Sequence, residues 1–149
     1  MYKLIGVIGG SSIDEELFNE AEKIGQMLAS FNVPVICGGG KGVMEAVSKG
    51  VKSKGGTTIG ILPYGKESAN PYIDIALATG IGFARNYIIV NSSDLIIAID
   101  GKYGTLTEIG YSLQFEKPII SYKSNIAKEL GIREAESIED IKKFVEENL

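Results

Sequence analysis

The chain is organised around residues 96–108, whose sequence is Ile96-Ile97-Ala98-Ile99-Asp100-Gly101-Lys102-Tyr103-Gly104-Thr105-Leu106-Thr107-Glu108. The first four residues of this stretch are apolar, which is typical of a strand buried on both faces. Gly101 and Gly104 permit a sharp turn, and Thr105 can accept hydrogen bonds from the first free amides of a following helix. The pattern therefore predicts a strand, a tight turn and a helix whose free amides can bind an anion.

A structural explanation of the same residues stays open. Thr105-Leu106-Thr107-Glu108 matches a capping box, in which Thr105 and Glu108 satisfy backbone amides of their own helix. Capping boxes are common, so this segment taken alone favours the structural explanation over an anion site.

Length and composition indicate one domain with a substantial core. The 149 residues are 44% hydrophobic and 23% charged, and nothing along the chain suggests a second domain. Nineteen acidic against fifteen basic residues give a net charge of −4, which argues against nucleic acid as a partner. The apolar runs are too short for a membrane span or a signal peptide, so we expect a cytoplasmic protein without membrane contact.

Cysteine and histidine usage excludes several kinds of site. Cys37 is the only cysteine and histidine is absent, so disulfide frameworks, Cys/His zinc sites and histidine-dependent catalytic triads are excluded. We therefore predict no metal site. Acid–base chemistry must use carboxyl groups, lysine or tyrosine, and Cys37 is expected to be a small buried side chain.

Strand and helix signals alternate along the chain. Short apolar runs predict strands at residues 3–8, 33–37, 57–62, 96–99 and 118–121, with a strand or extended segment at 73–78. With amphipathic helices between them, these runs imply βαβ crossovers. We therefore predict an α/β fold, a single Rossmann-like three-layer domain over residues 1–149 with a mostly parallel sheet flanked by helices. Ligands of such sheets bind beyond the carboxyl ends of the strands.

Three glycine-bearing turns are predicted at that edge of the sheet. They are Gly9-Gly10-Ser11-Ser12 after the first strand, Gly38-Gly39-Gly40-Lys41-Gly42 after the second, and residues 100–104 after the fifth. Local alternatives exist, because Ser12-Ile13-Asp14-Glu15 fits a capping box and a glycine run also makes a tight turn. Their coincidence at one edge predicts a phosphate or nucleotide crevice. Its predicted binding residues are Gly9, Ser11, Ser12, Gly38, Gly39, Gly40, Gly42, Gly101, Lys102, Tyr103, Gly104 and Thr105.

Arg85 needs a partner that its local sequence does not provide. The residue falls in the first turn of a helix predicted to open at residues 80–82 and run to about Ser92, where a cation opposes the helix dipole. A carboxylate within the fold would satisfy this arginine, and so would an anionic ligand. Both explanations stay open.

Two motifs resemble the Lonely-guy family of nucleoside-monophosphate phosphoribohydrolases. The first is GGGKGVM at residues 38–44 followed by GGTTIGILP at 55–63, and the second is residues 93–94 with 98–108, which is similar to the family's P-G-G-x-G-T-x-x-E. The resemblance covers most of the chain through about Ser121. It implies hydrolysis of the N-glycosidic bond of a nucleoside 5′-monophosphate, without a required cofactor.

The same resemblance assigns catalytic roles to Arg85 and Glu108. Glu108 would meet the sugar, and Arg85 would orient this carboxylate and keep it ionised. The lysine decarboxylase activity often attributed to the family is not expected, because no lysine here has the setting of a pyridoxal-phosphate site.

Departures from the family motif point to a second function. Asp100 stands where the motif has proline, Lys102 stands where it has its second glycine, and the residues beside Arg85 lack the family's Glu and Lys. An acid repels phosphate unless Lys102 compensates or Asp100 points away. These departures resemble relatives such as the molybdenum-cofactor carrier protein, which binds a pterin phosphate without hydrolysing a glycosidic bond. A carrier of molybdenum cofactor or a nucleotide sensor therefore stays open beside the hydrolase.

Relatives also imply self-assembly. Because they form dimers or higher assemblies, we expect a homo-oligomer, either a dimer or a tetramer, with the helix after Thr105 as the partner surface. The apolar surface of residues 83–90 exceeds what one helix face requires, which supports this expectation. The fold further resembles the core of DNA-processing protein A, a single-strand DNA binder, but the acidic balance and the lack of a basic patch argue against that function.

Overall fold

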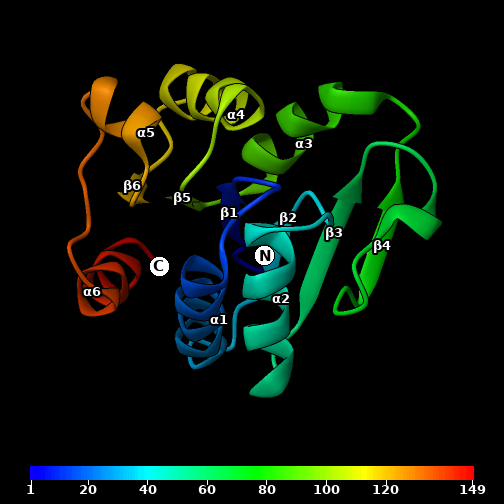
Figure 1. The fold of residues 1–149 in the computed structure, drawn as a ribbon, viewed down its shortest axis with the longest axis horizontal. Helices are drawn as coiled ribbons and strands as arrows, with labels where there is room; N and C mark the ends of the chain where they lie inside the picture. The colour runs from blue at the N-terminus through cyan, green and yellow to red at the C-terminus, as the bar shows by residue number, and fades with distance from the viewer.

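The computed structural model describes residues 1–149 and contains one six-stranded sheet (Figure 1). Its strands are β1 (Ile5–Gly9), β2 (Val35–Cys37), β3 (Thr58–Leu62), β4 (Ile75–Ala78), β5 (Leu95–Ile99) and β6 (Ile119–Tyr122). The α-helices are α1 (Glu15–Ala29), α2 (Val43–Ser53), α3 (Arg85–Ser92), α4 (Tyr103–Gln114), α5 (Asn125–Glu129) and α6 (Ile138–Asn148), and the 3-10 turns are η1 (Lys66–Ser68) and η2 (Gly82–Ala84). The spatial order is β4-β3-β2-β1-β5-β6, and all neighbouring pairs are parallel. The predicted Rossmann-like α/β fold is confirmed, and residues 73–78 contain a true strand.

Helices cover both faces of the sheet, which gives three layers. α1, α2 and α6 pack on one face, and α3, α4 and α5 pack on the other (Figure 1). In β5, Ile97 and Ile99 belong to the hydrophobic core beneath α1, α2 and α6, whereas Ile96 and Ala98 belong to the core beneath α3, α4 and α5. All four side chains are fully buried. Burial on both faces therefore explains the apolar run, as the sequence predicts. None of the helices combines the length and apolar character needed to cross a membrane.

β1 and β5 form the point at which the chain reverses its direction across the sheet. From β1 the chain continues through α1 to β2 on one side, whereas β5 lies on the other side of β1. The two strands pair in register from Ile5 with Leu95 to Gly9 with Ile99. The turns that follow them diverge at the carboxyl edge, and in open parallel sheets the crevice at such a point is the usual ligand site.

Gly9 allows the elements around this crevice to approach one another. A Cβ atom at Gly9 would lie 2.2 Å from the carbonyl oxygen of Ile99 and 2.8 Å from Cγ1 of Val43. We expect Gly9→Ala to lower the free energy of unfolding by about 1–3 kcal/mol, since the added methyl must push β5 or α2 away. Urea denaturation followed by circular dichroism measures this change.

Gly110 provides the matched control for Gly9. It lies exposed inside α4, and a Cβ atom there would meet nothing within 4 Å. Gly110→Ala should therefore raise the free energy of unfolding by about 0.5–1 kcal/mol through helix propensity alone. Equal effects of the two substitutions would show that Gly9 is not tightly packed.

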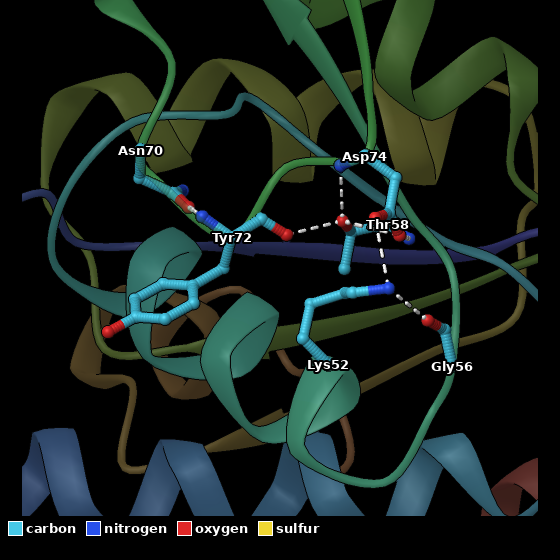
Figure 2. Close-up of polar contacts among 6 residues, drawn as sticks. All are labelled: Lys52, Gly56, Thr58, Asn70, Tyr72 and Asp74. Atoms are coloured by element: carbon cyan, nitrogen blue, oxygen red, sulfur yellow. Dashed lines mark hydrogen bonds and ion pairs between the residues drawn. The ribbon is translucent and has the colours of Figure 1, made fainter.

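A polar network fixes the connection between β3 and β4 (Figure 2). Asp74 accepts a hydrogen bond from the Thr58 amide at 3.0 Å and forms an ion pair with Lys52 of α2 at 2.9 Å. Lys52 also donates to the Gly56 carbonyl at 3.0 Å. Burial opposes ionisation of Asp74, but these contacts prevail and hold the pKa of its carboxyl below the ordinary value. The segment between β3 and β4 is thereby held against α2.

The predicted capping box at Thr105 is wrong. Asp100 and Gly101 both have positive φ, at 54° and 117°, so they complete the turn early and α4 begins at Tyr103. Thr105 consequently lies inside the helix. Since Glu108 makes no hydrogen bond to the helix start, the capping explanation of Glu108 is removed.

The capping alternative for Ser12 is also wrong. α1 is capped by Asp14, whose side chain accepts a hydrogen bond from the Leu17 amide at 2.8 Å. α6 is capped by Ser137, which accepts a hydrogen bond from the Asp140 amide at 3.2 Å. Ser12 is consequently free of a helix-capping role.

Candidate functional site

A cleft of about 290 Å³ opens where the turns after β1 and β5 diverge. Its walls come from these two turns, from η2, from the N-terminal parts of α3 and α4, and from Met44 of α2. The lining residues are Gly9, Gly10, Ser11, Ser12, Met44, Phe83, Arg85, Asn86, Asp100, Lys102, Gly104, Thr105 and Glu108. Of the predicted site residues, the cleft thus brings together Gly9, Ser11, Ser12, Arg85, Lys102, Gly104, Thr105 and Glu108.

The start of α4 presents unpaired amides to this cleft. Lys102 precedes the helix and its side chain makes no capping hydrogen bond. The amides of the first helical turn have no partner within the helix by geometry. Because Gly104 and Thr105 of that turn line the cleft, this helix start is suited to an anion.

Arg85 is buried at the base of the cleft. It is the first residue of α3, its side chain is 8% exposed, and its guanidinium lies against Gly38, where a Cβ atom would be 2.7 Å away. The guanidinium donates to Oδ1 of Asn86, whereas its buried Nε has no hydrogen-bond partner. Burial lowers the pKa of Arg85 from its ordinary value, and the neighbouring Glu108 opposes that shift. Arg85 remains a cation at neutral pH because an arginine pKa is far above 7.

Glu108 is a buried carboxyl group of the same cleft. It is 6% exposed, and Arg85 does not reach ion-pair distance of 4.0 Å from it. Burial raises the pKa of Glu108 to about 8, against a smaller opposing effect of the Arg85 charge. The expectation that Arg85 keeps Glu108 ionised is therefore wrong, because desolvation outweighs the attraction, and Glu108 is mostly protonated at neutral pH.

This protonation makes stability depend on pH. The ordinary pKa of 4.5 is raised to about 8 in the fold, so the folded state holds a proton that the unfolded state has lost between these values. The contribution of Glu108 to the free energy of unfolding is therefore fully present below pH 4.5 and is lost as pH rises toward 8. We expect the wild type to lose about 2 kcal/mol between pH 6 and pH 8 relative to Glu108→Gln. Urea denaturation of both proteins at the two pH values measures this difference, and parallel changes would contradict a raised pKa.

Asn86 connects Arg85 to the start of α4. Its side-chain oxygen accepts from Arg85, and its side-chain nitrogen donates to Oγ1 of Thr107 at 3.1 Å. Thr107 in turn donates to the Gly104 carbonyl at 2.7 Å. Asn86 is not among the site residues predicted from the sequence, although its position next to Arg85 in the chain is a signal for it.

The glycine run after β2 supports the cleft from behind and does not line it. Gly42 has a φ of 67°, and a Cβ atom there would lie 2.3 Å from the Gly10 carbonyl oxygen. That carbonyl accepts from the Val43 amide at 2.9 Å, so the start of α2 is already occupied by protein. Close packing of two loops therefore accounts for Gly42, and its direct contact with a ligand stays a prediction.

The remaining glycines of this run are held by the segment between β3 and β4. Asn70 donates from its backbone to the Gly39 carbonyl and from its side chain to the Gly40 carbonyl, both at 2.8 Å. Gly38 lies against the Arg85 guanidinium, as described above. Gly38, Gly39, Gly40, Gly42 and Gly101 all lie outside the cleft lining, and Tyr103 lines an adjoining hollow.

Asp100 faces the cleft and does not point away from it. Its Oδ2 would lie 2.3 Å from a Cβ atom at Gly10, so the carboxyl group rests against the β1 turn. Lys102 lines the same cleft. The charged groups are therefore the cations Arg85 and Lys102 and the carboxyl of Asp100, beside the mostly protonated Glu108. This balance still suits an anionic ligand.

Fold and site together define a Rossmann-like α/β protein with an anion-suited cleft at its topological switch point. The chain belongs to the SLOG cluster4 family, whose sequence model matches residues 2–147. The predicted resemblance to the Lonely-guy proteins is confirmed by this match and by the relatives described next.

Relatives with two different functions resemble this chain. An uncharacterised protein of Archaeoglobus fulgidus is 45% identical over 91% of this chain and 89% of its own length. The cytokinin riboside 5′-monophosphate phosphoribohydrolase of Mycobacterium tuberculosis is 30% identical over 70% of this chain and 62% of its own. The molybdenum cofactor binding protein of Rippkaea orientalis, whose structure is solved, is 33% identical, covers 99% of this chain and 97% of its own, and superposes with a TM-score of 0.92. The chain spans only 38% to 62% of the length of the matched phosphoribohydrolases.

Proposed function

We propose that this protein binds the phosphate ester of a nucleotide-like heterocycle in the cleft between the β1 and β5 turns. The observation that carries this proposal is a buried arginine without a carboxylate partner. Arg85 faces the same cleft as the free amides of α4, and its Nε has no hydrogen-bond partner. Buried charges in proteins are normally paired, so an anionic ligand is the natural partner of this group.

Within this class, we propose that the protein carries molybdenum cofactor. The cofactor would be bound as the transported ligand and would take no part in a reaction on this protein. The molybdenum cofactor binding protein of Rippkaea orientalis matches almost the whole chain, which supports this choice. The altered turn supports it too, because Asp100 and Lys102 replace the proline and glycine of the hydrolase motif. Arg85, Lys102 and the amides of Gly104 and Thr105 would hold the phosphate of the pterin. The protein is then a soluble cytoplasmic carrier.

A thermal-shift screen tests this proposal. We expect pterin phosphates and nucleoside monophosphates to raise the melting temperature, whereas the corresponding unphosphorylated compounds should not, because ligands stabilise the state they bind. Isothermal titration of the compounds that give shifts then provides their dissociation constants. Equal shifts with and without phosphate would contradict a phosphate-centred site.

Hydrolysis of a nucleoside 5′-monophosphate is the second candidate function. It is favoured by one specific observation, the buried Glu108 with a pKa of about 8 in a cleft that takes an anion. A neutral carboxyl at pH 7 can donate a proton to the departing base, for which this histidine-free chain has few other donors. The Arg85 cation would meanwhile hold the phosphate. Glu108 would act as a general acid in this mechanism and not as the ionised carboxylate first expected.

Free-base release distinguishes the two candidates. Each nucleoside monophosphate that binds is incubated with the protein and the products are separated by liquid chromatography. The carrier proposal expects intact ligand, and released base would establish the hydrolase instead. In that case the rate should fall as pH rises through 8, because the acid form of Glu108 is then lost.

We further propose that the protein is a homo-oligomer joined through α4. Leu106 and Leu113 of this helix are 39% and 45% exposed, and Tyr87 of the adjoining α3 is 44% exposed. Exposed apolar side chains on two adjoining helices favour a partner subunit. We expect light scattering at micromolar concentration to give the mass of a dimer or tetramer, and Leu113→Glu to reduce it toward that of a monomer. Leu130→Glu, at an equally exposed leucine after α5, is the control, and a monomeric wild type would contradict the proposal.

A further inference from the structure

A second hollow adjoins the cleft and has a different chemical character. It has a volume of about 470 Å³ and is lined by Ser11, Phe83, Asn86, Tyr103, Gly104 and Thr107. Four of these residues, Ser11, Phe83, Asn86 and Gly104, also line the cleft, so the two spaces are continuous. The cleft alone is at the lower limit of ordinary ligand sites, which are roughly 300–1,000 Å³, and the hollow extends it.

Two exposed aromatic rings border this hollow. Phe83 is 76% exposed and Tyr103 is 84% exposed. They differ from the other aromatic residues of this region, because Tyr87, Tyr111 and Phe115 pack against one another with centroid distances of 5.4–6.0 Å. Phe83 and Tyr103 have no such aromatic partner. Their faces are therefore available to a flat ring from outside the protein.

Charge divides the combined site into two halves. The cleft contains Arg85, Lys102 and Asp100, whereas none of the residues that line the hollow is charged. The hydroxyl of Ser11, between the two spaces, is exposed and makes no hydrogen bond to the protein. A ligand with one anionic end and one neutral, flat end matches this division.

We propose that the hollow is a binding site for a planar heteroaromatic ring, which stacks on Phe83 and Tyr103 while its phosphate occupies the cleft. The ring must be uncharged at neutral pH, since no counter-charge faces it, and Ser11 can hydrogen-bond to its edge or to the linking sugar. This inference rests on the proposed phosphate site and adds the ring as the second recognised group. It assigns Phe83 and Tyr103 to ligand binding, which the sequence pattern alone did not do for Phe83.

Isothermal titration with AMP and with ribose 5-phosphate separates the ring from the phosphate. AMP carries both groups, whereas ribose 5-phosphate lacks the ring. Since stacking of a base on an aromatic side chain contributes about 1–3 kcal/mol, the wild type should bind AMP roughly 5- to 100-fold more tightly than ribose 5-phosphate. Phe83→Ala and Tyr103→Ala should each remove most of this difference and change the affinity for ribose 5-phosphate by less than about twofold.

Conservative and distant substitutions serve as controls. Tyr103→Phe and Phe83→Tyr keep a ring and should keep the affinity for AMP. Tyr2→Ala removes a tyrosine that is 89% exposed and precedes β1, at the sheet edge opposite the cleft, and it should leave both affinities unchanged. Loss of both affinities in the alanine variants would show a structural role and overturn the stacking proposal.

Three further outcomes separate failure of this inference from failure of the proposed function. Equal wild-type affinities for AMP and ribose 5-phosphate would overturn the ring site and leave the phosphate site intact. Absence of binding by either compound and by pterin phosphate would overturn the phosphate site itself. A change of mass in light scattering of Phe83→Ala or Tyr103→Ala, with unchanged affinities, would assign the rings to a subunit contact and also overturn the proposal.

Discussion

Replacing Arg85 with alanine is expected to weaken the binding of phosphorylated ligands about 10- to 100-fold. A hydrogen bond to a charged group contributes about 1.5–3 kcal/mol, and each 1.4 kcal/mol is a factor of ten in affinity. The fold should survive, because Arg85 forms no ion pair with a carboxylate in the structure and Glu108 is mostly neutral. Titration with AMP and circular dichroism measure these two quantities.

Arg133 is the matched control for Arg85, since it is the only other arginine of the chain. Its guanidinium lies at the surface in an ion pair with Glu147 of α6, at 3.7 Å. Arg133→Ala removes the same charge and should leave the affinity for AMP within about twofold of the wild type. Equal losses in the two variants would mean that overall charge, and not the cleft, attracts the ligand.

Binding of phosphorylated ligands should weaken about tenfold between pH 7 and pH 9. Glu108 loses its proton with a pKa of about 8, and the resulting carboxylate repels a phosphate in the same cleft. The ligand does not contribute to this change, because the second pKa of a phosphate ester is near 6. Burial raises the pKa of Cys37, which lies close to Arg85, above its ordinary value, and this disfavours a thiolate beside the ligand.

Glu108→Gln isolates the origin of this pH dependence. The amide has almost the same shape and no ionisable proton, so the variant should bind AMP equally at pH 7 and pH 9. Titrations at both pH values, in a buffer of constant ionic strength, measure the effect. A wild type without pH dependence, or a variant that retains it, would contradict protonation of Glu108 in the cleft.

The fold could be predicted because its signals are local. The run Ile96 to Ile99 is apolar at every position and rich in β-branched isoleucine, which favours a strand buried on both faces. Glycine-bearing turns after the first and fifth strands then place the crevice by topology alone, since parallel strands end at one edge. The predicted set of Ser11, Arg85, Lys102, Thr105 and Glu108 does meet in one cleft.

The errors concern properties that depend on tertiary contacts. Gly42 has a positive φ and packs against the Gly10 carbonyl, so a protein contact accounts for a glycine that the sequence pattern assigns to a ligand loop. The start of α4 depends on how Asp100 and Gly101 complete the turn, which no capping pattern reveals. The protonation of Glu108 depends on its burial, and that burial comes from helices and strands distant in sequence.

The most direct test of a phosphate site between the β1 and β5 turns is an amide NMR titration. Uniformly ¹⁵N-labelled protein is titrated with ribose 5-phosphate, and the shift of each backbone amide is recorded. The proposed site predicts that the largest shifts fall on residues 10–12 and 102–105, with saturation at one dissociation constant. Shifts confined to other helix starts, such as residues 125–127 or 138–140, or no saturable shift at any amide, would contradict it.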